Sequence, residues 1–140
     1  MQLYPNLSFD GQCEAAFQLY EKCLRGRITF MTTYENSPMA SELSPAWRKK
    51  IFHATFTLGD FLLSGGDPLP GQYQKPQGFA LQLNLSDPGE AERIFNALAE
   101  SGTIQMPLQE TSWALRFGVL VDPFGIPWLI NCDQPTSPDR

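Results

Sequence analysis

The sequence is poor in the residues that metal and acid–base sites use most often. It contains one histidine and three cysteines, and the cysteines lack CxxC spacing, which limits both metal binding and acid–base catalysis. No stretch approaches the roughly 18 apolar residues of a membrane span, and the first residues do not resemble a signal peptide. Ten basic residues against 15 acidic ones leave no broad basic surface. We therefore expect neither a membrane nor a nucleic acid as a partner.

The three cysteines predict a reducing compartment. Their number is odd, and Cys13 and Cys23 lie ten positions apart on a predicted helix. A helix separates such residues by about 15 Å along its axis, which is too far for a disulfide. We expect Cys13, Cys23 and Cys132 to be buried or half-buried free thiols in a cytoplasmic protein.

What the sequence does contain is typical of a globular chain with many turns. Its 140 residues suit one domain, or two small modules that share a core. Hydrophobic residues make up 42% of the chain, which excludes a disordered protein. Twelve prolines and eleven glycines favour short strands over long helices.

The first half of the chain predicts one helix and four strands. The helix, over 11–24, has apolar residues at the i, i+3, i+4 spacing of one buried face. We expect Asp10 to cap its start and Gly26 to take the left-handed conformation after its end. The strands are predicted over 2–9, 27–35, 53–60 and 61–67, with a Pro/Ser-rich loop at 36–49 and a linker at 68–77.

The second half repeats this order. After a strand over 79–86, Asp87 is placed to cap a helix in which Pro88 takes the first position and Glu90 the third. This helix is predicted to end at Gly102. Strands over 103–109 and 126–132 follow, the last one after a turn at Asp122-Pro123-Phe124-Gly125.

The spacing of the helix signals predicts a duplication. The two cap aspartates, Asp10 and Asp87, lie 77 positions apart, and the two glycines at the helix ends, Gly26 and Gly102, lie 76 apart. Both halves therefore read as one β-α-β-β-β unit.

Three segments carry a resemblance to a known family: LYPNLSFDGQCEAAFQLY, IFHATFTLGDFLLSGGD and QETSWALRFGVLVDPFGIPWLINC. With them the chain resembles, over nearly its whole length, the PhnB-like branch of the vicinal-oxygen-chelate (glyoxalase/bleomycin-resistance/dihydroxybiphenyl dioxygenase) superfamily. The last segment is the most specific, because these residues fall at the spacing that the branch uses: Gln109, Thr111, Trp113, Phe117, Asp122, Phe124, Gly125 and Trp128.

The resemblance implies an α+β fold of two βαβββ modules that form an open, curved mixed sheet around a cleft. It implies a single glyoxalase-like domain over 1–134, with modules at about 1–68 and 78–133, and leaves 135–140 as a loose tail. Members are usually dimers, so we expect a homodimer, with the modules paired within one chain or exchanged between two.

The resemblance leaves the activity open. The superfamily includes isomerases, lyases, dioxygenases, thiol transferases that inactivate antibiotics, and metal-free proteins that sequester drugs. The PhnB-like branch is often labelled a 3-demethylubiquinone methyltransferase, but the sequence has no glycine-rich strand-to-helix loop for S-adenosylmethionine. Because Gly65-Gly66 precedes Asp-Pro and not a helix, we expect no methyltransferase activity.

The resemblance also says where a metal would bind. Metal-dependent members hold one divalent ion with His, Glu or Gln from the first and last strand of each module. At these four places the sequence offers Asn6, Asp67, Gln82 and Asn131, and only Asp67 is a carboxylate. Neutral amides bind a divalent transition metal weakly. We expect the four residues to line a polar cleft with neither metal nor cofactor, and keep an atypical metal site around Asp67 as the alternative.

Two side chains are candidates for catalysis. His53 is either a general base or hydrogen-bonding group of the cleft, or a structural histidine bonded to backbone. Asp67 is either a cleft acid or the cap of the Gly-Gly-Asp-Pro turn. Asp122 is expected to be a structural residue of its turn.

Aromatic side chains give further candidates. Trp113 and Phe117 either offer a flat surface to a ligand or belong, with Phe124 and Trp128, to the core or a dimer interface. Trp47, in the Pro/Ser-rich loop, suggests a lid over the cleft or a contact with a second subunit.

The basic run Arg48-Lys49-Lys50 either attracts an anion or forms a solvated surface.

We predict a metal-free homodimer that binds a small, partly aromatic or anionic molecule. A metal-dependent lyase, isomerase, dioxygenase or transferase that uses Asp67 and His53 is one alternative, and a structural or interaction protein is another. The predicted ligand-binding residues are Asn6, His53, Asp67, Gln82, Trp113, Phe117 and Asn131.

Overall fold

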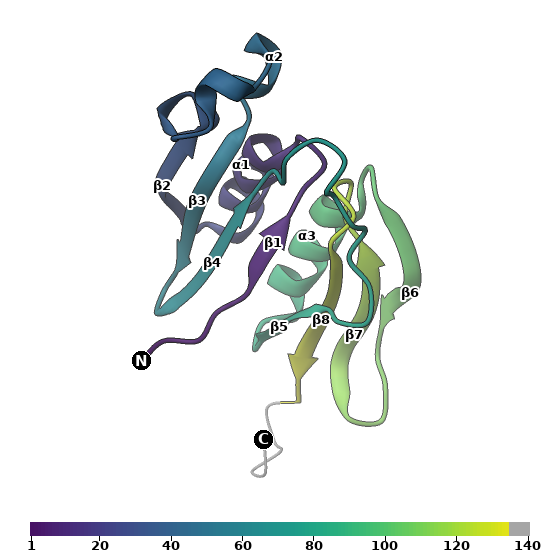
Figure 1. Cartoon of the computed structure of the whole chain (residues 1–140). Helices are drawn as coiled ribbons and strands as arrows, with labels where there is room; N and C mark the ends of the chain where they lie inside the picture. The colour runs from purple at the N-terminus through teal and green to yellow at the C-terminus, as the bar shows by residue number, and fades with distance from the viewer. Residues whose placement is uncertain (135–140) are drawn as a thin grey trace. The chain divides into compact units, whose positions relative to one another are not determined.

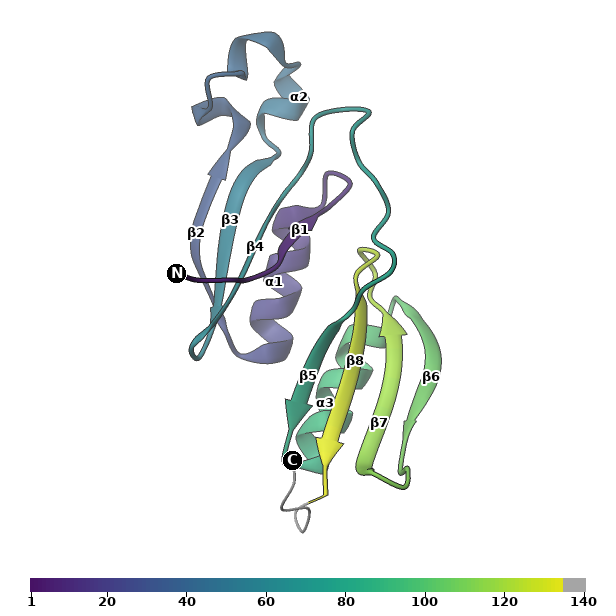
Figure 2. The same ribbon diagram turned by 60° about the horizontal axis from the view of Figure 1, so that its bottom comes forward.

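The computed structural model describes residues 1–134, so the predicted loose tail at 135–140 lies outside the described residues. The chain divides into two compact units, which we call unit 1 (Met1–Gln74) and unit 2 (from Lys75). Each unit holds a four-stranded sheet with a three-turn helix on one face (Figures 1 and 2). The predicted duplication of a β-α-β-β-β order is confirmed.

The two sheets share one topology. The strand order is β1-β4-β3-β2 in unit 1 and β5-β8-β7-β6 in unit 2. The first strand of each unit pairs in parallel with the last one, and the other pairs are antiparallel. Unit 1 contains β1 (Asn6–Ser8), α1 (Cys13–Leu24), β2 (Arg27–Thr33), α2 (Pro45–Arg48), β3 (Ile51–Leu58) and β4 (Phe61–Gly66), with 3₁₀ turns at Tyr34–Asn36 and Ala40–Glu42. Unit 2 contains β5 (Leu81–Leu85), α3 (Pro88–Ala99), β6 (Thr103–Gln109), β7 (Ala114–Val121) and β8 (Pro127–Asp133).

The core of each unit lies between its long helix and its sheet. In unit 1 the Phe17 ring of α1 meets Phe9 at 5.9 Å and Phe56 of β3 at 6.1 Å between centroids. In unit 2 a Cβ at Gly118 of β7 would come within 2.6 Å of the Phe95 ring of α3, so helix and strand approach closely there. The apolar face predicted for the first helix is confirmed, because Cys13, Ala16, Phe17, Tyr20 and Leu24 are buried. The buried face of α3 consists of Ala91, Ile94, Phe95 and Leu98.

The start of α1 depends on a residue far along the chain. The Asp67 carboxylate, directly after β4, accepts the backbone N–H of Cys13 through Oδ1 at 3.0 Å and that of Ile51 through Oδ2 at 2.9 Å. Cys13 is the first residue of α1 and Ile51 the first of β3. One carboxylate therefore satisfies an unpaired N–H of the helix terminus and joins it to two strands.

The prediction that Asp10 caps this helix is wrong. Asp10 is exposed, the helix begins three residues later, and the residue at the cap position, Gln12, makes no side-chain capping bond. Gly11, with φ +76°, turns the chain between Asp10 and the helix. Asp67 supplies the oxygen that Asp10 was expected to supply.

The prediction for the other end of α1 is also wrong. Arg25, not Gly26, takes the left-handed conformation, with φ +61°. Gly26 is required for space: a Cβ there would lie 2.4 Å from Cζ of Phe56 and 2.6 Å from the Thr57 carbonyl oxygen. The sequence correctly indicated that position 26 needs a glycine, but the reason is the close approach of its backbone to β3.

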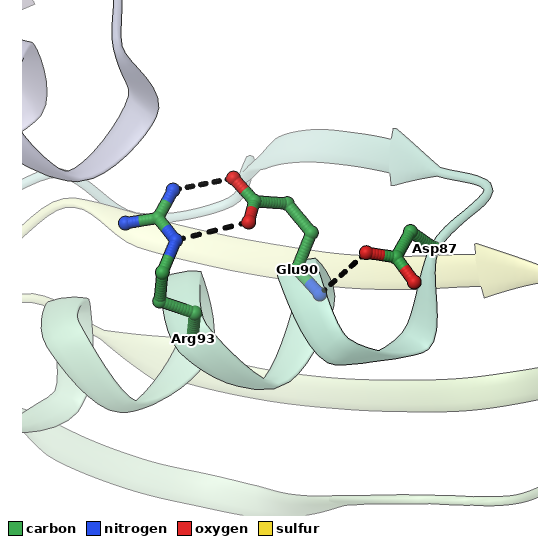
Figure 3. A network of polar contacts seen from close by, with 3 residues as sticks. All are labelled: Asp87, Glu90 and Arg93. Atoms are coloured by element: carbon green, nitrogen blue, oxygen red, sulfur yellow. Dashed lines mark hydrogen bonds and ion pairs between the residues drawn. The ribbon is translucent and has the colours of Figure 1, made fainter.

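The start of α3 matches its prediction. The Asp87 carboxylate accepts the N–H of Glu90 at 3.2 Å, and Pro88 is the first residue of the helix. Figure 3 shows this bond beside the ion pair that Glu90 forms with Arg93 one turn on. The helix ends at Ala99, three residues before the predicted Gly102.

Other boundaries also moved. The strand predicted over 2–9 is paired only at Asn6–Ser8, and the strand predicted over 53–60 begins earlier, at Ile51. The loop predicted over 36–49 holds a 3₁₀ turn and α2, whose start is capped by Ser44.

All three cysteines are free and buried, as predicted. Burial, and next the charge of Asp67, raise the pKa of the Cys13 thiol well above its usual range, so this thiol stays protonated. Within residues 1–134 no helix is long and apolar enough to cross a membrane.

Replacing Asp67 tests its structural role. Asp67→Ala leaves two buried N–H groups without their acceptor, and we expect it to lower the free energy of unfolding by about 2–4 kcal/mol. Asp10→Ala, the matched control, should change it by less than about 0.5 kcal/mol. Urea unfolding followed by circular dichroism measures both; equal effects would show that Asp67 does not hold the helix.

A pair of glycine variants tests the packing at Gly26. Gly26→Ala forces a methyl group against Phe56 and should destabilise the protein by about 1–3 kcal/mol. Gly89→Ala, in α3, meets no atom closer than 3.8 Å and should stabilise it by about 0.5–1 kcal/mol through helix propensity. Thermal unfolding of the two variants separates these opposite signs. Equal melting temperatures for Gly26→Ala and the wild type would contradict the packing argument.

Candidate functional site

Unit 1 contains a pocket of about 220 Å³ on the face of its sheet that α1 leaves uncovered. It lies over the parallel pair β1–β4 and the start of β3. The lining residues are Asn6, Ser8, Tyr34, Phe52, His53, Gly65, Gly66, Asp67 and Pro68. Three predicted site residues, Asn6, His53 and Asp67, are thus brought together from distant parts of the sequence.

A β-bulge shapes one wall of the pocket. Thr32 pairs with His53 and the next residue, Thr33, pairs with Ile51, so Phe52 has no partner on β2. Without the bulge, alternation would place Phe52 and His53 on opposite faces of the sheet. With it both residues are exposed and both line the pocket.

Two polar side chains of the pocket keep hydrogen-bonding groups available. Asn6 Oδ1 accepts the hydroxyl of Ser64 at 2.7 Å, which leaves the Asn6 amide nitrogen without a partner among the described residues. The His53 imidazole makes no hydrogen bond within residues 1–134; its ring lies 6.1 Å from the exposed ring of Phe30. His53 is therefore not the backbone-bonded structural histidine that was one of its two interpretations.

Asp67 is 1% exposed and committed to the fold. Burial raises the pKa of its carboxyl, and the backbone N–H groups of Ile51 and Cys13 act in the opposite direction. Its carbonyl oxygen accepts the phenol of Tyr34 at 2.6 Å, and burial, then Asp67, raise the pKa of Tyr34 so that the phenol remains a donor. The Tyr34 and Phe52 rings lie 5.2 Å apart.

The other predicted site residues lie in unit 2. Asn131 of β8 is 4% exposed, and its amide nitrogen donates to Oδ1 of Asn84 at 3.3 Å. Gln82 donates to the same oxygen at 2.9 Å. Trp113 packs edge-on against Phe117 at 5.5 Å and is 45% exposed.

The residues present do not fit the divalent ion of the superfamily. Both oxygens of Asp67 are engaged by backbone N–H groups, and Asn6 uses its amide oxygen to accept from Ser64. In the described part of the chain no three His, Cys, Asp or Glu side chains lie close enough to hold a metal. The amides Gln82 and Asn131 are weak ligands for transition metals.

Asp122, and Arg48 and Lys50 of the basic run, make hydrogen bonds within the fold. Asp122 accepts the N–H groups of Phe124 and Ile126 at 2.9 and 3.0 Å and the indole of Trp128 at 2.9 Å, which confirms it as a structural residue of its turn. Arg48 donates to the carbonyl of Ala40, and Lys50 to that of Gly11.

The sequence did not indicate Ser8, Tyr34 or Phe52 as site residues. Ser8 is two residues from Asn6 on the same strand, so alternation could have added it. Tyr34 and Phe52 carried no such signal, because a 3₁₀ turn and a bulge place them.

The chain is similar to several known proteins over almost its whole length. The family model described as 3-demethylubiquinone-9 3-methyltransferase matches residues 1–131. Protein YjdN of Escherichia coli is 33% identical over 98% of this chain and 100% of its own. The crystal structure of protein PA1353 from Pseudomonas aeruginosa is 41% identical, covers 96% of this chain and 98% of its own, and has a TM-score of 0.87.

More distant structures agree in fold. The PhnB protein from Bacillus cereus is 24% identical over 94% of this chain and 99% of its own, with a TM-score of 0.80. A glyoxylase/bleomycin resistance protein/dioxygenase domain from Frankia is 12% identical over 98% and 94%, with a TM-score of 0.67. The chain therefore belongs to the 3-demethylubiquinone-9 3-methyltransferase family and has the fold of the PhnB protein and of the glyoxylase/bleomycin resistance protein/dioxygenase domain.

Proposed function

We propose that this protein binds a small molecule in the unit 1 pocket and does so without a metal. The observation that carries the proposal is the pocket itself, which places unengaged polar groups of Asn6 and His53 beside the rings of Tyr34 and Phe52. Ligand sites typically combine apolar walls with a few polar groups that fix orientation.

The volume and lining suggest the kind of ligand. Pockets for drug-sized molecules usually measure about 300–1,000 Å³, so a cavity of about 220 Å³ suits a smaller one. The Phe52 ring offers a flat contact, and the Asn6 amide nitrogen offers a hydrogen-bond donor. A single ring with a carboxylate or amide substituent matches both features.

The geometry gives less support to the enzymatic alternatives. An enzyme built on Asp67 would need that carboxylate to exchange protons or bind a metal, yet both of its oxygens bond to backbone. The methyltransferase name of the family finds no support in the strand-to-helix connections, which lack a glycine-rich loop for S-adenosylmethionine. The β1–α1 connection contains one glycine, Gly11, and the β5–α3 connection, Ser86-Asp87, contains none.

We also propose that the protein is a homodimer in the cytoplasm. The edge strands β2 and β6 expose apolar side chains, with Phe30 at 51%, Ile104 at 50% and Met106 at 41%. Exposed apolar edges of a sheet favour pairing with another chain. The three free thiols support a reducing compartment.

Binding of single-ring probes tests the pocket. Benzoate and benzamide titrated into ¹⁵N-labelled protein should shift amide signals of Asn6 and His53 saturably. His53→Ala should weaken the binding by about fivefold or more through loss of one hydrogen bond and a ring contact. Thr55→Ala, on the same strand but outside the pocket, is the matched control.

Two outcomes would contradict the proposal. One is a protein, as purified or after titration by calorimetry, that holds Zn²⁺, Mn²⁺, Ni²⁺ or Fe²⁺ tightly and stoichiometrically. The other is an unchanged affinity for both probes in His53→Ala.

Sedimentation velocity tests the homodimer. The wild type should sediment as a dimer, and Ile104→Glu should shift it toward monomer, because a charge is costly in an apolar interface. Gln105→Glu adds the same charge at the neighbouring position and should have less effect. A monomeric wild type at micromolar concentration would refute the assembly.

A further inference from the structure

The exposed phenyl ring of the unit 1 pocket belongs to Phe52, which is 41% exposed. Phe52 lies in the bulge of β3 and has no partner on β2, so pairing with β2 does not hold it in place. A ring that receives a ligand contributes most to affinity when its orientation is set before the ligand binds. Two contacts, both of which lead to Asp67, set the orientation of Phe52.

The first contact acts on the backbone. The N–H of Ile51 donates to Oδ2 of Asp67 at 2.9 Å, and the N–H of Asp67 donates to the carbonyl oxygen of Ile51 at 2.8 Å. Asp67 is 1% exposed, so water does not compete for these bonds. Phe52 therefore directly follows a residue that is hydrogen-bonded to Asp67 in both directions.

The second contact acts on the ring. The centroids of Phe52 and Tyr34 lie 5.2 Å apart with 58° between the ring planes, a separation typical of favourable aromatic pairs. Tyr34 is fixed in turn, because its hydroxyl donates to the carbonyl oxygen of Asp67 at 2.6 Å and its N–H to that of Lys50 at 3.0 Å. At 4% exposure, Tyr34 offers a ligand almost no surface of its own. Its contribution to the pocket is the position of Phe52.

We infer that Tyr34 is a positioning residue for Phe52 and makes the pocket select planar rings over puckered ones. This inference rests on the proposed function and narrows its ligand class to planar carboxylates or amides. A planar ring can stack on a phenyl ring that is held in one orientation, whereas a puckered ring of the same charge meets it at fewer atoms. Because Tyr34 acts through Phe52, its loss changes the preference between ligands and not only the overall affinity.

Benzoate and cyclohexanecarboxylate test this preference, because they carry the same charge and differ in ring shape. An aromatic pair changes an affinity by about two- to tenfold, and we expect the wild type to bind benzoate about fivefold more tightly. Shifts of the backbone amide signals of Asn6 and His53 measure both affinities. Tyr34→Leu, which removes the ring contact, should bring the ratio of the two affinities close to one.

Two further variants guard this test against effects on folding. Tyr34→Phe keeps the ring and loses only the hydroxyl bond to Asp67, so it should give a ratio between those of the wild type and Tyr34→Leu. Ser37→Ala is the matched control: it removes a hydroxyl that donates to the Tyr34 carbonyl oxygen at 2.7 Å and leaves the ring contact intact. Its ratio should equal that of the wild type.

A double variant separates positioning from direct contact with the ligand. Phe52→Leu removes the flat wall and should weaken benzoate binding about fivefold. In this background Tyr34→Leu should change the benzoate affinity by less than twofold, since residues that act as a unit are not additive. A further fivefold loss would show that Tyr34 contacts the ligand itself, and would overturn its positioning role.

The remaining outcomes distinguish this inference from the proposed function. Equal binding of the two acids by the wild type would overturn the inference and leave the proposed pocket in place. A fivefold ratio that persists in both Tyr34→Leu and Tyr34→Phe would do the same. Failure of both acids to bind the wild type would refute the proposed function, and this inference with it.

Discussion

The carboxylate of Asp67 is the point on which unit 1 depends. It receives one N–H from the first turn of α1 and one from the start of β3, while its own residue ends β4. The partners Asp67 and Cys13 are 54 positions apart. Through this group the helix is held at one end of the sheet, and the same contacts set the wall of the pocket beside Tyr34 and Pro68. Because both oxygens of the carboxylate accept backbone N–H groups, this side chain serves the fold and is not available for catalysis.

Unit 2 reaches the same topology by local means. Asp87 caps α3 from the preceding residue, and Asp122 organises the turn into β8 within six positions. The duplicated halves therefore agree in strand order and in helix length, but they differ in how helix termini and turns are satisfied. Each unit has a polar group without a hydrogen-bond partner within residues 1–134: the His53 imidazole in unit 1 and the amide oxygen of Asn131 in unit 2. These groups are available to bind a ligand.

This difference explains which features the sequence could predict. The start of α3 was predicted because Asp87, Pro88 and Glu90 act on their own neighbours. The start of α1 was mispredicted because the local candidate, Asp10, competes with an oxygen that only folding brings near. The pocket shows the same division: Asn6, His53 and Asp67 were chosen as cleft residues and line it together, whereas Tyr34 and Phe52 were missed. Their places depend on a 3₁₀ turn and a bulge, neither of which alters hydrophobic periodicity enough to be seen.

The bulge at Phe52 also has an evolutionary consequence. Since Phe52 is the one residue of this stretch of β3 without a partner on β2, a deletion of its codon would leave the pairing of His53 and the residues after it in register. The deletion would remove an aromatic wall of the pocket and would also shift Ile51 relative to Asp67, to which it is hydrogen-bonded. The wall of the pocket and the pairing of β2 with β3 are therefore separable from His53 onward, whereas the start of β3 is tied to Asp67.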